Sequence, residues 1–367
     1  MLNLTRLPEF ILLGLSSRPE DQKPFFVLFL TIYLLTLMGN LFIILTIRSD
    51  PQLQNPMYFF LSFLSFADIY YTTAVVPKML TNFLSDTKTI SYAECLTQMY
   101  FFLAFGNMDS YLLAAMAIDR YVAICNPFHY VTVMNHRRCM LLLVFSVVFP
   151  CLHSLLHVLL MHRLSFCESN VIHHFFCDVN PLLKLTCSST SVNELVLMTE
   201  GLASVVAPLI CIIISYLQIL ITVLRIPSAA GKRKALSTCS SHLTVVTLFY
   251  GSIIYVYFRG LSSYTVKDQI ATIVYTVLTS MLNPFIYTLR NKDMKRGLGK
   301  LRGRIKSEMN RLFPTKSKKI HNPNCNVWIC AIAHTEPPAY SSAHIFTNKH
   351  IPAADSSLIG RNTLSSL

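Results

Sequence analysis

The chain has 367 residues, of which 53% are hydrophobic and only 13% are Asp, Glu, Lys or Arg. Soluble globular domains carry roughly 25% charged residues, so this composition excludes an ordinary soluble protein and indicates a surface that faces lipid. The net charge of +13 does not indicate nucleic-acid binding, because the basic residues follow the loops of a membrane topology.

Seven apolar stretches are each long enough to cross about 30 Å of hydrocarbon as a helix. In lipid the backbone must satisfy its own hydrogen bonds, so these stretches are predicted to be helices and not open strands. They cover residues 25–47, 57–80, 97–124, 139–161, 193–224, 236–258 and 270–289. The expected fold is therefore an all-α membrane protein, with a seven-helix bundle over residues 25–289 after an N-terminal segment over 1–24.

Basic residues decide the orientation of this bundle, because short cytoplasmic loops are enriched in Lys and Arg. They gather after the first, third and fifth stretches and in the segment 290–319, which holds about a dozen against only Asp293 and Glu308. The C-terminus is therefore predicted to be cytoplasmic and the N-terminus extracellular. Asn3 opens a glycosylation sequon that agrees with this multi-pass orientation.

The segment 290–313, after the seventh stretch, is predicted to be a basic amphipathic helix. Its apolar residues recur at helical spacing: Leu298, Leu301, Ile305, Met309 and Leu312. Such a helix is expected to lie on the inner membrane surface, where acidic lipids attract it, and the alternative is a solvated basic tail. Residues 314–367 are rich in Ser, Asn, Pro, Ala and His without periodicity, and are predicted to be disordered.

Four cysteines are expected on the extracellular side, at the start of the third stretch and in the loop before the fifth. They are Cys95, Cys167, Cys177 and Cys187. Extracellular cysteines usually pair, and four allow three connectivities that the spacing alone does not distinguish. His173 and His174 beside Cys177 offer a zinc or copper site as the alternative, although disulfides would consume the thiols.

Charged residues inside the stretches are functional candidates, because a charge within a membrane is costly. Asp119, Arg120 and Tyr121 end the third stretch at the cytoplasmic face, where an ion pair can hold a closed state and act as a switch when it opens. Tyr216 and Tyr287 lie at a similar depth and can receive the freed guanidinium.

Asp68 and Asp109 both lie near the membrane midplane. Two neighbouring carboxylates cannot both ionise there without help, and either a shared proton or a bound sodium ion would resolve this. No other cofactor is expected. The alternative is that each carboxyl group hydrogen-bonds separately to Asn40, Asn283 or Ser280.

A small, mildly polar helix face lies in the outer half of the third stretch. Its members follow i, i+3, i+4, i+7 spacing and are Leu103, Gly106, Asn107 and Ser110. Ile253, Ile254 and Tyr257 lie in the outer half of the sixth stretch. Together the two groups are predicted to line an apolar cavity with a few polar donors, which is the usual composition of a small-ligand site. The alternative is ordinary helix packing through small residues.

Several motifs, taken in order and spacing, resemble the olfactory receptors, a branch of the rhodopsin-like G-protein-coupled receptors. The resemblance covers roughly residues 5–310, and its motifs are residues 39–40, 56–61, 116–125, 215–216, 234–243 and 283–291. Two positions depart from the family pattern: Ile118 stands where Tyr is usual, and Ser280 stands where Pro is usual. The tail after Lys319 is also longer than the family norm.

The resemblance implies roles for residues that the motifs carry. Cys95 would pair with Cys177, and Cys167 with Cys187. Asp68 and Asp109 would match the family's cation site, and Arg120 would be the coupling arginine. Tyr250 would be the toggle-like aromatic beneath the ligand, and Tyr257 a ligand contact. The partner would be a stimulatory olfactory G protein that raises cAMP.

The expected function is therefore an odorant receptor in the plasma membrane that binds a small lipophilic odorant. On activation the sixth helix would swing outward at its inner end, near Lys234 and His242. An enzyme is not expected, because the chain lacks a Gly-rich phosphate loop, a zinc-protease helix motif and a nucleophile elbow. A transporter is disfavoured by the lack of a half-to-half repeat. A non-signalling decoy of the same fold is the alternative that the departures leave open.

Overall fold

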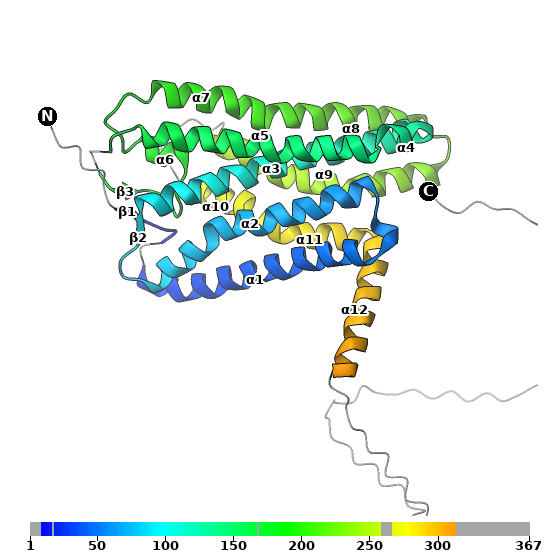
Figure 1. Cartoon of the computed structure of the whole chain (residues 1–367), viewed down its shortest axis with the longest axis horizontal. Helices are drawn as coiled ribbons and strands as arrows, with labels where there is room; N and C mark the ends of the chain where they lie inside the picture. The colour runs from blue at the N-terminus through cyan, green and yellow to red at the C-terminus, as the bar shows by residue number, and fades with distance from the viewer. Residues whose placement is uncertain (1–8, 17, 167–168, 258–265, 313–367) are drawn as a thin grey trace, which may run out of the picture. The chain divides into compact units, whose positions relative to one another are not determined.

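The computed structural model describes residues 9–16, 18–166, 169–257 and 266–312, all within one unit that ends at Pro314. The predictions for Asn3, Cys167 and the tail over 314–367 lie outside these residues. Within the described ranges, seven membrane-length segments run side by side (Figure 1). They are α1 (Pro19–Ser49), α2 (Pro56–Leu84), α3 (Tyr92–Cys125), α5 (His136–His162), α7–η3–α8 (Ser191–Gly201, Leu202–Val206, Ala207–Arg225), α9 (Ala229–Tyr257) and α10–η4–α11 (Val266–Ile273, Val274–Leu278, Thr279–Arg290).

The seven-helix fold is confirmed, and most helices extend several residues beyond the apolar stretch that predicts them. Polar residues at the helix starts explain the extension. The Asn55 side chain accepts from the backbone N–H of Tyr58 at 3.2 Å, and Ser91 with Glu94 forms a capping box at the start of α3. These side chains satisfy backbone donors of the first turn, so a helix can continue past the hydrocarbon.

The fifth and seventh segments each contain a π-helical turn, η3 and η4, which the hydropathy pattern does not indicate. A π-turn displaces carbonyls from the regular hydrogen-bond ladder. In η3 these carbonyls are satisfied from α3, because Ser110 Oγ donates to Ser204 O at 2.9 Å and Tyr111 OH donates to Ala203 O at 3.1 Å. The turn therefore fixes the position of α3 against the fifth segment.

A small sheet at the N-terminal end of the bundle has the strand order β2 (Thr89–Ser91), β1 (Glu9–Leu12), β3 (Val171–Ile172). The central strand β1 pairs antiparallel with β2 and parallel with β3. Phe10 and Leu12 of this strand are fully buried, so the N-terminal segment packs on the bundle. Periodicity could not predict the sheet, because its longest strand has four residues.

The short elements lie at the ends of the bundle. Two of them, η2 (Pro127–His129) and α4 (Tyr130–Val133), follow α3, while η1 (Pro51–Leu53) follows α1 and α6 (Val179–Leu183) follows β3. The predicted amphipathic helix is α12 (Lys292–Leu312), and the side chains of Ile305, Met309 and Leu312 are exposed along it. This exposed apolar stripe fits a helix that lies on a membrane surface.

An ion pair holds α12 against the end of α1. Lys300 Nζ lies 2.9 Å from Asp50 Oδ2, and Arg304 donates to Ser49 O at 3.0 Å. The hydrogen bond from Lys300 lowers the pKa of the Asp50 carboxyl group. Asp50 is therefore ionised at neutral pH, and the pair is lost only when the pH falls through this lowered pKa.

Close packing of α1 on α11 depends on a glycine. A Cβ atom on Gly39 would lie 2.9 Å from Pro284 Cβ. We therefore expect Gly39→Val to destabilise the protein by about 1–3 kcal/mol through overpacking. Thermal unfolding of the detergent-solubilised protein measures the effect. Gly251→Val on α9 is the matched control, because no atom lies within 4 Å of the position that a Cβ atom would take there. Equal melting temperatures for the two variants would refute the prediction.

Candidate functional site

A cavity of about 600 Å³ lies among α3, α5, the fifth segment, α9, α10–η4 and the loop from β3 to α6. Its volume falls in the range of roughly 300–1,000 Å³ that is typical of small-molecule sites. The structure places five of the predicted ligand contacts in its lining: Leu103, Gly106, Asn107, Ser110 and Ile253. The helix face predicted on the third stretch therefore faces this cavity.

Two other predicted contacts on α9, Ile254 and Tyr250, do not line the cavity. Ile254 is 40% exposed and absent from the lining, because neighbouring residues on a helix point about 100° apart and only Ile253 faces inward. Tyr250 is buried next to the cavity without lining it. The side chain of Tyr257 lies outside the described residues.

Two histidines on α5, which were not predicted as site residues, complete a polar wall of the cavity. His153 and His157 line the cavity, with ring centroids 4.8 Å apart. The side-chain amide nitrogen of Asn107 donates to His153 Nδ1 at 3.0 Å, so the ring proton of neutral His153 lies on Nε2. Histidines at i, i+4 within an apolar stretch share a helix face, and this spacing was the signal that could have found them.

The floor of the cavity is linked to α9 through Ser110. The single hydroxyl proton of Ser110 goes to Ser204 O, so Tyr250 OH donates to Ser110 Oγ over a distance of 2.6 Å. One side chain thus joins α3, η3 and α9 next to the ligand cavity. A molecule that displaces Ser110 would disturb a contact on which α9 depends.

The inner half of α9 is held by His242, which is 2% exposed. Its Nε2 lies 3.0 Å from Leu113 O, and a carbonyl oxygen can only accept, so Nε2 carries the proton. In the neutral ring Nδ1 then accepts from Tyr216 OH at 2.8 Å. His242 therefore bridges α9 to both α3 and α8.

The predicted ion pair between Asp119 and Arg120 is not found in the part of the chain that the structure describes. Asp119 Oδ1 instead accepts from Tyr130 OH of α4 at 2.7 Å. Burial, reinforced by the Asp119 carboxylate, raises the pKa of Tyr130, which therefore stays protonated and donates. Adjacent residues on a helix point in different directions, so Asp119 and Arg120 do not face each other. Tyr130 of α4 is therefore the partner of Asp119 in place of Arg120.

The other predicted switch residues lie on α3, α9 and α11. Tyr121 is half-buried and packs against the apolar cluster of Ile219, Val223 and Cys239. Tyr287 is 2% exposed, and its hydroxyl has no hydrogen-bond partner among the described residues. Such a buried, unsatisfied hydroxyl is able to form one further hydrogen bond. The side chain of Lys234 lies outside the described residues.

The two membrane-embedded carboxylates differ in their partners. Asn283 donates its side-chain amide to Asp68 Oδ2 at 2.8 Å, whereas Asp109 Oδ1 is buried without a hydrogen-bond partner among the described residues. The two carboxylates are close enough for their charges to interact. Asn40 donates to Ser280 O and not to either carboxylate. The Oδ1 atom of Asn283 is also buried and unpartnered within the described ranges, so hard oxygen atoms suited to an alkali cation gather here.

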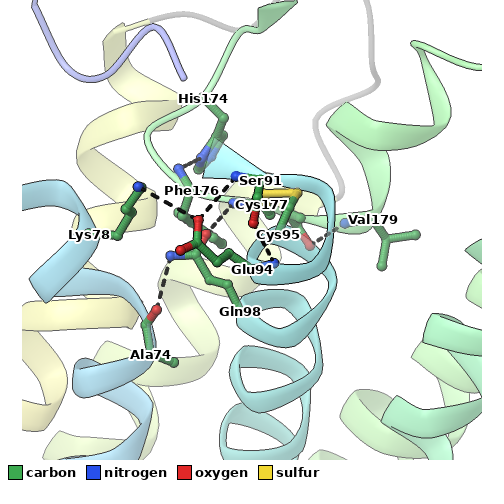
Figure 2. The surroundings of a disulfide bond; sticks show 11 residues. Ala74, Lys78, Ser91, Glu94, Cys95, Gln98, His174, Phe176, Cys177 and Val179 are labelled. Atoms are coloured by element: carbon green, nitrogen blue, oxygen red, sulfur yellow. Dashed lines mark hydrogen bonds and ion pairs between the residues drawn. A yellow bond between two sulfur atoms is a disulfide. The ribbon is translucent and has the colours of Figure 1, made fainter. Parts of the chain in front are cut away.

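The disulfide between Cys95 and Cys177 is confirmed, and it ties the loop between α5 and α7 to the start of α3 (Figure 2). Gln98 strengthens this junction, because its Oε1 accepts from Cys177 N at 2.9 Å while its Nε2 donates to Ala74 O at 3.0 Å. Cys187 is also disulfide-bonded. The junction holds the loop residues that roof the cavity.

A zinc or copper site in this loop would need Cys177 as a thiolate ligand. Cys177 is instead in the disulfide and cannot bind a metal in this way. His174 is buried beside it, and its Nδ1 accepts from Phe176 N at 3.3 Å. Burial lowers the pKa of His174 to about 3, so this ring is neutral at physiological pH. Over the described ranges, the structure holds no group of three or more His, Cys, Asp or Glu side chains that could bind a metal.

Comparison with known proteins gives the same family over most of the chain. Residues 29–302 match the family model described as olfactory receptor. The chain is 78% identical over 323 residues to human olfactory receptor 1L3, covering 88% of this chain and 99% of that protein. It is 75% identical over 306 residues to human olfactory receptor 1L1, covering 83% and 85%. Rat olfactory receptor 1f45 is 53% identical over 300 residues, covering 82% and 96%.

Proposed function

Because the chain belongs to the olfactory receptors, a family of multi-pass, non-enzymatic signalling receptors, we propose that it binds a small lipophilic odorant and activates a stimulatory heterotrimeric G protein. The proposed site is the cavity between α3, α5, the fifth segment and α9. The proposed location is the plasma membrane, with the N-terminus outside and the basic helix α12 on the cytoplasmic lipid surface. The product of signalling would be a rise in cAMP.

The observation that supports this function best is the link between the cavity floor and α9. Ser110 lines the cavity and accepts from Tyr250 of α9, so occupancy of the cavity can change how α9 is held. A ligand shifts a conformational equilibrium only by its difference in affinity for the two states. An odorant that binds better when the contact between Ser110 and Tyr250 is rearranged would favour the active state.

At the inner end, activation would separate α9 from its neighbours. The bonds from His242 to Leu113 O and Tyr216 hold the closed position, and an outward swing of α9 breaks both. Arg120 would then turn toward Tyr216 and Tyr287, whose hydroxyl groups face this region. The opened cavity would admit a helix of the G protein.

Arg120→Ala is expected to abolish ligand-evoked cAMP, with at least a tenfold loss at matched surface expression. The measurement is cAMP accumulation in cells that express the full chain and receive a mixed odorant panel, with surface staining beside it. Arg137→Ala, an exposed arginine at the start of α5, is the matched control and should respond normally. A full response from Arg120→Ala would overturn the coupling role.

We also propose that a sodium ion binds between Asp68 and Asp109 and stabilises the closed state. The oxygens Asp109 Oδ1 and Asn283 Oδ1, which are unpartnered among the described residues, support this, since a cation would satisfy both. Replacing extracellular sodium with N-methylglucamine should raise basal cAMP several-fold in the unmodified receptor. Asp109→Asn should lose this sodium dependence while remaining on the cell surface. An equal sodium response in Asp109→Asn would argue against the site.

A further inference from the structure

The ligand cavity reaches the surface of the bundle along one edge of α7. Met198 and Leu202 both line the cavity, yet their side chains are 72% and 60% exposed. On α5, the lining residues His153 and His157 are buried. The wall of the cavity is therefore closed along α5 and open beside α7.

This open edge lies in the outer part of a membrane-length segment. The fifth segment crosses the membrane from Ser191 to Arg225, and a helix rises 1.5 Å per residue. Met198 and Leu202 then lie roughly 10 and 16 Å along the helix from its outer end. This 35-residue segment is longer than the roughly 30 Å of hydrocarbon, so Met198 lies near the boundary of the acyl chains and Leu202 lies within them.

A glycine keeps the edge open. Gly201 lines the cavity between Met198 and Leu202, and no atom lies within 4 Å of the position that a Cβ atom would take. The space beside this backbone is therefore open, and a side chain at this position would occupy it. The exposed lining residues at the loop end of the cavity, His173 and Lys184, are polar, whereas Met198 and Leu202 at the open edge are apolar.

We propose that Met198, Gly201 and Leu202 form a lateral port through which the cavity exchanges apolar molecules with the outer leaflet of the bilayer. This inference deepens the proposed function and rests on the cavity being the ligand site. Each methylene group raises the ratio of bilayer to water concentration about fourfold, so a long-chain odorant collects beside this port. The ligand class is therefore an amphiphile with an alkyl chain, delivered from the membrane.

A lipid that cannot leave the bilayer tests the port without any knowledge of the odorant. The full chain is reconstituted in nanodiscs that contain phosphatidylcholine with a diazirine at the end of one acyl chain. Its headgroup stays at the interface, so the diazirine can reach the cavity only from the side. After photolysis, mass spectrometry is expected to find label on the cavity face of α3, at Leu103 and Asn107.

Filling the port should block this labelling. In Gly201→Phe the label on α3 is expected to fall at least fivefold, relative to the label on Ile210, which is exposed on α8 and absent from the cavity lining. Gly201→Leu should give a smaller fall. Gly251→Phe is the matched control, because this helical glycine also has no atom within 4 Å of a Cβ position but does not line the cavity. The Ile210 signal in each variant reports correct insertion.

Two results would overturn the port. One is label on Ile210 with none on α3 in the unmodified receptor, and the other is undiminished label on α3 in Gly201→Phe. The labelling needs neither an odorant nor a G protein. A receptor that labels as expected but gives no odorant-evoked cAMP would therefore count against the proposed function and leave the port intact.

Discussion

Cys95→Ser is expected to remove most of the receptor from the cell surface. The disulfide between Cys95 and Cys177 closes a loop with a sequence separation of 82 residues. A cross-link over such a loop contributes about 4–5 kcal/mol in the chain-entropy model, which is a large part of the stability of a typical domain. Both cysteines are fully buried, so the variant also leaves a thiol without its partner in the roof of the cavity.

Surface staining of intact cells, normalised to total protein, measures this loss. Cys211→Ser is the control, since Cys211 is a free, partly buried cysteine on α8 that lies outside this junction. Gln98→Leu should cause a smaller loss, because it removes the hydrogen bonds to Cys177 N and Ala74 O but keeps the disulfide. Normal surface levels for Cys95→Ser would show that the loop is held by other contacts.

His242→Leu is expected to raise ligand-independent cAMP strongly. The substitution removes the hydrogen bonds to Leu113 O and Tyr216, which hold the inner half of α9 in the closed position. Two hydrogen bonds of about 1 kcal/mol each correspond to a shift of roughly 30-fold in the equilibrium between closed and open states. If the closed state is strongly favoured at rest, basal activity should rise by nearly this factor.

Basal cAMP per receptor at the surface is the quantity to compare. Tyr216→Phe removes one of the two bonds and should give an intermediate rise. Ser240→Ala is the control on the same helix, because the Ser240 hydroxyl donates within α9, to Ser237 O. Unchanged basal activity in His242→Leu, at normal surface level, would mean that α9 is held elsewhere.

The fold could be predicted from the sequence because a membrane imposes one dominant constraint. Each span must be long, apolar and helical, and this pattern survives without knowledge of any tertiary contact. The face of α3 toward the cavity was predicted for a similar reason. Small and mildly polar residues at helical spacing, such as Gly106 and Asn107, lie on the same face of the helix, and this does not depend on which helix packs beside it.

The contacts that depend on tertiary structure could not be predicted in this way. The partner of Asp119 is Tyr130, and a loop conformation brings the two together. Ile254 was assigned to the cavity because it lies at the right depth, but its direction depends on the rotation of α9. The π-turn η3 shifts the helix face toward the cavity, and hydropathy carries no signal for such a turn.

The sheet that holds the N-terminal segment has a consequence for how the protein is made. Strand β1 is synthesised first, but its parallel partner at Val171 is made about 160 residues after Ile11. Translation at roughly 5–20 residues per second leaves β1 without this partner for about 8–32 s. During that time Phe10 and Leu12, which are fully buried in the finished molecule, are accessible to chaperones. The nascent chain therefore passes through an aggregation-prone interval that ends only when the loop after α5 emerges.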